Sequence, residues 1–282
     1  MTITVTPDIA DAAPARPDRP AYRVTALGVL RSEWGKFWSL RSSWITLGVS
    51  LFLLTAIGAI AAATYSPGSN GGGPPGSSSG PEDAVSVALT GLTFASLAVG
   101  VLGVLMSAGE YSTGMIRSTL AAVPRRLPVL WSKSVVTGVL VVPVAVIGAL
   151  AAFGLGVASL DGQSISMSLG DDGVLRSLIG AGLYLGLVGV WGVALGSLLR
   201  STASGITVLV SSLLILPGLT SLLPASWKDD ITPYLPSNAG QAVTHLHQAT
   251  DSLGPWAGLA VFAGWVALTL AGAAYRLVRT DV

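Results

Sequence analysis

Six long apolar runs constrain this chain more than any other feature of its sequence. An α-helix needs about 20 residues to cross the hydrocarbon core of a bilayer, and each run is long enough. The runs lack the alternation of apolar and polar residues that marks a strand of a membrane barrel. Only 10% of the 282 residues are charged, against about 25% in a soluble domain. The sequence therefore predicts an all-α integral membrane protein with helices at residues 44–64, 84–108, 134–160, 174–199, 204–223 and 256–275.

Basic residues set the expected orientation. Thirteen of the 15 Lys and Arg residues fall before the first run, between the second and third, or after the fourth and sixth; the exceptions are Arg176 and Lys228. Loops rich in Lys and Arg stay in the cytoplasm, so both termini are predicted to be cytoplasmic. Arg outnumbers Lys twelve to three, a bias typical of a GC-rich bacterial genome. We therefore expect a multi-pass protein of the bacterial cell membrane.

The N-terminal region divides into two parts. Residues 1–20 hold four prolines and no apolar periodicity, which is typical of a disordered tail. We place its end at residue 22, so that residues 23–282 form one six-span domain. Between residues 26 and 41, apolar side chains recur at steps of three and four and predict an amphipathic helix on the cytoplasmic surface. The residues assigned to this interfacial helix are Arg31, Glu33, Trp34, Lys36 and Trp38. The alternative is that the helix extends the first span.

The connections on the other side differ in character. Residues 66–81 consist of Gly, Pro, Ser and Asn alone and predict a flexible external loop. Residues 224–255 form the longest external connection, in which Ser237 or Asn238 is expected to cap a short helix running through His247. This helix is too short and polar to span, so we expect it either to dip into the outer leaflet or to cap a pathway. Pro217 is expected to kink the fifth span.

Small residues recur on one face of the fourth run. Small side chains allow close approach of helix backbones in lipid, so tight helix packing is the expected role of Gly182, Gly186, Gly189 and Gly196.

Several chemistries are missing from the sequence. The chain has no P-loop and no cysteine, so it has neither that ATP site nor a thiolate nucleophile or ligand. His245 and His247 are two residues apart and would point in different directions on a helix, which makes them poor metal co-ligands. None of the six runs holds Asp, Glu, Lys or His, which disfavours an ion-coupled carrier. We expect no enzymatic activity, cofactor, metal or nucleic acid, and an energy source outside the chain.

Three stretches carry a resemblance to a known family. They are LRSEWGKFWSLRSSW at residues 30–44, GEYSTGMIRSTLAAVPRR at 109–126 and LPSNAGQ at 235–241. With the six-span layout, they resemble the permease subunit of type-2 ATP-binding-cassette (ABC) exporters, especially those of actinobacteria. The resemblance implies a homo- or heterodimer of permeases, two copies of a separate cytoplasmic ATPase, and contact of that ATPase with the N-terminal helix and the loop after the second span. It also implies that the external segment before the last span forms short re-entrant helices. It leaves the substrate open.

The loop at residues 109–133 gathers the residues to which the resemblance gives a role. Ser112 or Thr113 is expected to cap a short helix through Leu120, ended by Pro124, with Glu110 just before it. The residues assigned to ATPase coupling are Glu110, Tyr111, Thr113, Arg117, Arg125 and Arg126. The alternative is that these arginines only enforce topology and touch lipid phosphates.

Two other functions stay open at this point. One is a non-transporting membrane sensor or immunity scaffold that binds an external peptide through residues 224–255. The other is the ion-coupled carrier, against which the charge-free runs argue.

Overall fold

The computed structural model describes residues 25–65, 83–123, 126–160, 165–222, 224, 230–247 and 253–279. Within these ranges the regular structure is helical and contains no strand. The N-terminal tail and the Gly-, Ser- and Pro-rich loop that the sequence predicts lie outside the described residues.

Six helices are long and apolar enough to cross a membrane, as the sequence predicts. They are α2 (Arg41–Ala63), α4 (Leu92–Ser112), α6 (Leu127–Leu160), α7 (Val174–Leu199), the Thr202–Leu219 segment and α12 (Pro255–Arg279). The Thr202–Leu219 segment comprises α8 (Thr202–Val210), a π-helical turn at Ser211–Ile215 and α9 (Leu216–Leu219). A 3-10 turn at Thr220–Leu222 follows.

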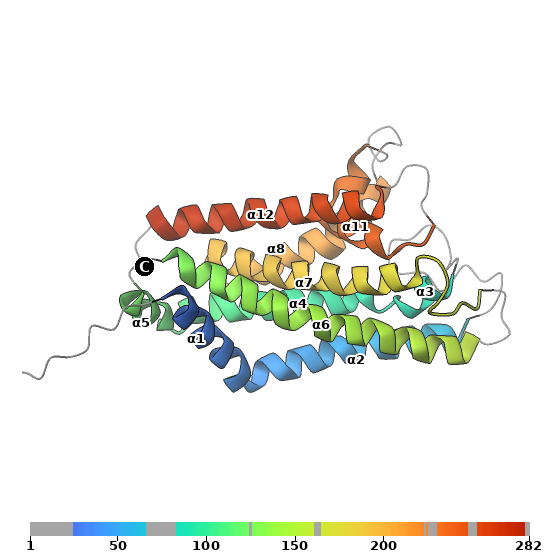
Figure 1. Ribbon diagram of the computed structural model, residues 1–282. Helices are drawn as coiled ribbons and strands as arrows, with labels where there is room; N and C mark the ends of the chain where they lie inside the picture. The colour runs from blue at the N-terminus through green and yellow to red at the C-terminus, as the bar shows by residue number, and fades with distance from the viewer. Residues whose placement is uncertain are drawn as a thin grey trace, which may run out of the picture.

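The long helices lie side by side, with α7 in the middle of the bundle (Figure 1). α7 packs against α4, α6 and α12, and α2 packs against α4 and α6. Two short helices mark the ends: α5 (Met115–Ala122) lies at one, with the end of α12, and α11 (Pro236–Gln241) lies at the other (Figure 1). These are called the α5 end and the α11 end.

The N-terminal helix α1 (Ala26–Ser39) lies at the α5 end and runs obliquely to the long helices (Figure 1). The Thr25 hydroxyl caps it by accepting a hydrogen bond from the Gly28 N–H. Leu40 has an extended backbone and separates α1 from α2. α1 is therefore a separate helix and not an extension of the first span.

The second apolar run folds as two helices. α3 (Ala84–Ala88) begins with a capping box in which the Asp83 carboxylate accepts from the Ser86 N–H, and α4 starts only at Leu92. Gly91 lies in the turn between them, where a Cβ atom would be 2.5 Å from the Leu53 carbonyl oxygen of α2. The close approach of two backbones interrupts the helix there, a tertiary effect that the apolar run does not reveal.

Several membrane helices extend further toward the α5 end than the sequence predicts. α2 begins at Arg41, α4 continues to Ser112, α6 begins at Leu127 and α12 continues to Arg279. Glu110 and Lys133, which lie just outside the apolar runs, are therefore inside helices. The prediction was wrong because hydrophobicity marks where the apolar side chains stop, whereas the backbone hydrogen bonds continue past that point.

The fifth span is irregular before its proline. The Leu216 N–H donates to the Ser211 carbonyl, five residues back, which defines the π-helical turn. Pro217 follows directly and has no N–H for a normal helical bond. The sequence predicts a kink at Pro217, and the structure places the helix irregularity in the turn just before it.

The short helix before the last span differs from its prediction. α11 has no side-chain cap, continues as a 3-10 turn (Ala242–Thr244) and ends before His247. The Asn238 side chain donates to the Thr232 carbonyl (2.9 Å) instead of capping the helix. The helix is inserted into the bundle, since a Cβ atom on Gly240 would meet the Tyr184 ring at 2.5 Å.

The four glycines singled out in α7 lie against two different neighbours. Cβ atoms on Gly182 and Gly186 would meet valine side chains of α6, and one on Gly196 would lie 2.8 Å from the Val104 carbonyl oxygen of α4. Gly189 lies between the two helices, near Val99 and Thr137. α7 is therefore packed through small residues on both sides.

Gly192, next to these four, makes the closest approach. A Cβ atom on Gly192 would lie 2.2 Å from the Gly100 carbonyl oxygen, and one on Gly103 would lie 2.2 Å from the Gly189 carbonyl oxygen. No Cβ atom can stand so close to a backbone, so α4 and α7 meet only because both helices carry glycine here.

We expect Gly192→Ala to lower the unfolding free energy by about 1–3 kcal/mol, the usual cost of overpacking. Gly48→Ala is the matched control, because nothing lies within 4 Å of a Cβ atom on Gly48 of α2; it should leave stability unchanged or raise it by up to about 1 kcal/mol. Denaturant titration in mixed micelles measures both. Equal effects of the two substitutions would contradict the close contact between α4 and α7.

Candidate functional site

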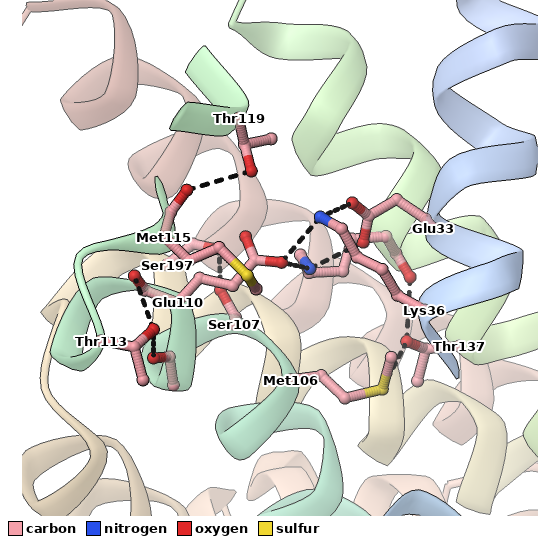
Figure 2. A network of polar contacts seen from close by, with 12 residues as sticks. Glu33, Lys36, Met106, Ser107, Glu110, Thr113, Met115, Thr119, Thr137 and Ser197 are labelled. Atoms are coloured by element: carbon pink, nitrogen blue, oxygen red, sulfur yellow. Dashed lines mark hydrogen bonds and ion pairs between the residues drawn. The ribbon is translucent and has the colours of Figure 1, made fainter. Parts of the chain in front are cut away.

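Four charged side chains from α1, α4 and α6 meet at the α5 end of the bundle; Figure 2 shows Glu33, Lys36 and Glu110 pointing toward one another. Lys133 Nζ lies 2.7 Å from Glu33 Oε2 and 3.0 Å from Glu110 Oε1. Lys36 Nζ lies 2.7 Å from Glu33 Oε1 and 3.0 Å from Glu110 Oε1. Each lysine therefore bridges both glutamates, and the four residues form one neutral cluster, called the charge cluster below.

The charge cluster is buried. The side chains of Glu33, Glu110 and Lys133 are 2%, 5% and 5% exposed, and only Lys36, at 27%, reaches the surface. Two of the three glutamates and two of the three lysines in the chain are gathered here. Charges without partners would be too costly at this depth, so the pairing is a condition for the three helices to pack together.

Local structure supplies each member of the cluster. Glu33 and Lys36 are three residues apart on α1, which places them on neighbouring positions of one helix face. Glu110 lies in the last turn of α4 and Lys133 in the second turn of α6. Below Lys133, the Thr137 hydroxyl donates to the Lys133 carbonyl (2.9 Å) and approaches Met106 Sδ at 3.8 Å, which joins α6 to α4 (Figure 2).

The electrostatics of the cluster keep its α1 members ionised. Burial alone would raise the pKa of Glu33, but the charge and hydrogen bond of Lys133, aided by Lys36, outweigh it and hold that pKa below its usual value. Burial would lower the pKa of Lys36, but its hydrogen bond and ion pair with Glu33, aided by Glu110, raise it instead. Both side chains therefore enter the cluster charged at neutral pH.

The capping prediction for the loop after α4 was wrong. Glu110 is inside α4 and not at the N-terminus of α5, which begins at Met115. Both Ser112 and Thr113 donate their hydroxyls to the Gly109 carbonyl at 2.9 Å. α5 has Gly114 at its N-terminus, with φ 73°, and no side-chain cap. Because a left-handed residue reverses the chain here, glycine and not a hydroxyl residue makes the turn.

The other residues assigned to ATPase coupling point in several directions. Tyr111 is half-buried beneath the Arg200 guanidinium, which lies 5.5 Å from the ring centroid. Arg126 donates to the Leu277 carbonyl of α12 (3.1 Å). Thr113 and Arg117 are exposed. Arg125 and Pro124 lie outside the described residues.

The residues assigned to the interfacial helix fall into two groups. Glu33 and Lys36 face the bundle and belong to the charge cluster, whereas Arg31, Trp34 and Trp38 are exposed. The buried apolar residues of α1 are Val29 and Phe37. Leu27, which is also apolar, is 77% exposed.

Lys133 is the member of the cluster that sequence reasoning missed. It was counted only as one more positive charge of a cytoplasmic loop. The available signal was its rarity, since the chain has three lysines, together with its flanking serines at the start of an apolar run. Serines 132 and 134 are buried as well, which a surface loop would not require.

The structure brings no metal site together. Within the described residues, no three His, Asp or Glu side chains gather in a way that would hold a metal ion. His247 Nδ1 lies 3.7 Å from Asp83 Oδ2 at the α11 end and is largely exposed. The main chain of His245 accepts from Arg176 (3.1 Å).

Comparison with known proteins adds no identification. No family model matches the chain, and a search of curated proteins finds no match.

The charge cluster is suited to joining helices. Every charged nitrogen in it contacts two carboxylates, and both Glu33 oxygens are engaged. One oxygen, Glu110 Oε2, is buried without a hydrogen-bond partner among the described residues. The cluster holds α1 firmly against α4 and α6 while all four charges are present. Removal of one charge leaves another buried and unpaired, which weakens this contact.

We expect Glu33→Gln and Lys133→Met each to lower the unfolding free energy by about 3–5 kcal/mol, because each leaves a buried charge unbalanced. In the double variant the cluster is neutral again, so its unfolding free energy should fall by much less than the sum of the two single effects. Unfolding of all variants in neutral mixed micelles gives the coupling energy.

The matched control is Arg31→Gln, which removes an exposed charge from the same helix and should change stability by no more than about 0.5 kcal/mol. Additive effects of Glu33→Gln and Lys133→Met would show that the two side chains do not interact.

Proposed function

We propose that the chain is the membrane-spanning permease subunit of an ATP-driven ABC exporter. In this proposal it lies in the bacterial cell membrane as a homo- or heterodimer with a second permease, with both termini in the cytoplasm, and couples to two copies of a separate ATPase. The three sequence stretches that resemble type-2 permeases support the proposal, together with six membrane-capable helices in the expected order.

The charge cluster is the observation that carries the proposal. A permease powered from outside must pass a cytoplasmic movement into its spans. α1 and α5 lie at the same end of the bundle (Figure 1), and α5 follows α4 after only Thr113 and Gly114. Through Glu33, Glu110 and Lys133, the cluster joins α1 to α4 and α6. A displacement of α1 would therefore move α4 and α6 through the ion pairs, and a displacement of α5 would move α4 through the chain.

α5 offers a surface for such a partner. Ile116 is buried and anchors the helix, while Arg117 is exposed and Met115 is 45% exposed. An exposed arginine beside an apolar side chain fits a partner surface that carries carboxylates, with which the guanidinium can form two parallel hydrogen bonds.

The structure offers no specific support for the two other functions. Glu110 and Lys133 do lie within spans, but they are at the ends of those spans and are paired, whereas ion-coupled carriers bind near the midplane. At the α11 end, Ser237, Ala239 and Gly240 of α11 are buried in the bundle. That segment is therefore less open to an external peptide than the sequence had led us to expect.

Co-purification tests the proposal. The chain is purified with an affinity tag from its native host, and we expect a P-loop ATPase to purify with it. Arg117→Glu should reduce capture at least tenfold, about the effect of losing 1.4 kcal/mol, without changing the stability of the isolated chain. Arg117→Lys keeps the charge and should retain most of the capture.

Asp172→Arg is the positional control, because Asp172 is exposed near the start of α7, at the α11 end, and its reversal should have no effect on capture. The proposal fails if no P-loop ATPase is captured. Unchanged capture by Arg117→Glu would remove α5 from the contact.

A further inference from the structure

α1 has three distinct faces, of which the charge cluster uses one. Val29, Glu33 and Phe37 follow each other at steps of four residues and are buried. This inner face packs against α6 and carries Glu33 into the cluster. The two other faces are both exposed, but they differ sharply in composition.

The outer face is apolar and cationic. Leu27, Arg31, Trp34 and Trp38 recur at steps of four, three and four, which places them in one row along a helix. Leu27, Trp34 and Trp38 are 77%, 40% and 52% exposed. The third face contains only small residues, all exposed: Gly28, Ser32, Gly35 and Ser39. A helix with one apolar, one small and polar, and one buried face is suited to a boundary between lipid, water and protein.

Tryptophans continue the outer face onto the first span. The ring centroids of Trp34 and Trp38 are 6.3 Å apart, and those of Trp38 and Trp44 are 4.5 Å apart. Trp44 lies in the first turn of α2, next to the exposed Arg41. Tryptophan is enriched at the level of the lipid head groups, and this row lies where a membrane-capable helix begins.

The exposed charge on this surface has one sign. Glu33 is the only acid between residues 25 and 81, and it is buried. Arg31 and Arg41 are exposed, and Lys36 is engaged in the cluster. Because Glu33 is turned inward, α1 and the start of α2 together present two arginines and three tryptophans, with no acidic partner for the arginines among the described residues.

We propose that the outer face of α1 with the start of α2 binds the anionic head groups of the membrane surface. Its residues are Leu27, Arg31, Trp34, Trp38, Arg41 and Trp44. The tryptophans enter the boundary between head groups and chains, and the arginines pair with lipid phosphates. Two cations near an anionic surface give about a 30-fold preference for anionic over neutral lipid. The interaction needs no ATPase and does not depend on the proposed function.

Fluorescence quenching by brominated lipids tests this proposal. The full chain is reconstituted in phosphatidylcholine vesicles containing brominated phosphatidylglycerol or brominated phosphatidylcholine. The chain has eight tryptophans, so the signal of this surface is the difference between the unaltered chain and the triple variant Trp34→Phe, Trp38→Phe, Trp44→Phe. We expect the brominated phosphatidylglycerol to be preferred about 30-fold at low ionic strength.

Three variants separate the contributions. Arg31→Gln with Arg41→Gln should abolish most of the preference, Arg31→Lys with Arg41→Lys should keep it, and Ser32→Gln with Ser39→Gln, on the third face, should leave it unchanged. Inorganic phosphate should not compete beyond chloride at equal ionic strength.

Five results would overturn the proposal, and the first four concern the preference for anionic lipid. They are equal quenching by both lipids, a preference that survives removal of both arginines, a preference that the lysine variant loses, and competition by free phosphate, which would indicate a soluble anion as the ligand. If neither lipid quenches these tryptophans, the face is covered by protein, a second copy included, and the proposal is wrong.

Discussion

The burial of four charges constrains the α5 end of this molecule. Three of the charged side chains are at most 5% exposed, and no single one of them is tolerable there without its partners. α1, α4 and α6 can therefore pack at this end only when all three are in place, because each supplies charges that balance those of the others. Apolar contacts alone would allow α1 several positions along the bundle. The ion pairs Lys36–Glu110 and Lys133–Glu33 permit only one of them.

The rest of the bundle is held by close backbone contact. α7 meets α4 where Gly192 lies against the backbone of Gly100 and Gly103 lies against the backbone of Gly189, so no larger residue fits at Gly192 or Gly103. In lipid the hydrophobic effect does not drive helices together, so such contacts and the polar joints carry the specificity. The glycines fix the centre of the bundle and the charge cluster fixes its α5 end, which makes α1 the element whose position depends most on electrostatics.

Hydrophobicity was enough to predict the six spans, and helical periodicity was enough to predict α1. The charge cluster was beyond reach, because Glu33, Glu110 and Lys133 are far apart in the chain and each looks like an ordinary loop or surface charge. The same limit explains the errors near Gly91 and Gly114, where a close backbone approach and a left-handed turn end a helix. The sequence gives the chemical character of each residue, but only the folded structure shows which residues far apart in the chain are in contact.

The central claim is that the charge cluster holds α1 against α4 and α6. Amide hydrogen exchange tests it most directly, since it reports the local opening of each helix. In Lys133→Met, the amides of α1 should exchange at least tenfold faster than in the unaltered chain, about the effect of losing 1.4 kcal/mol, and this factor should be clearly larger than the one for the amides of α12. Unchanged exchange in α1, or an equal increase in every helix, would contradict the claim.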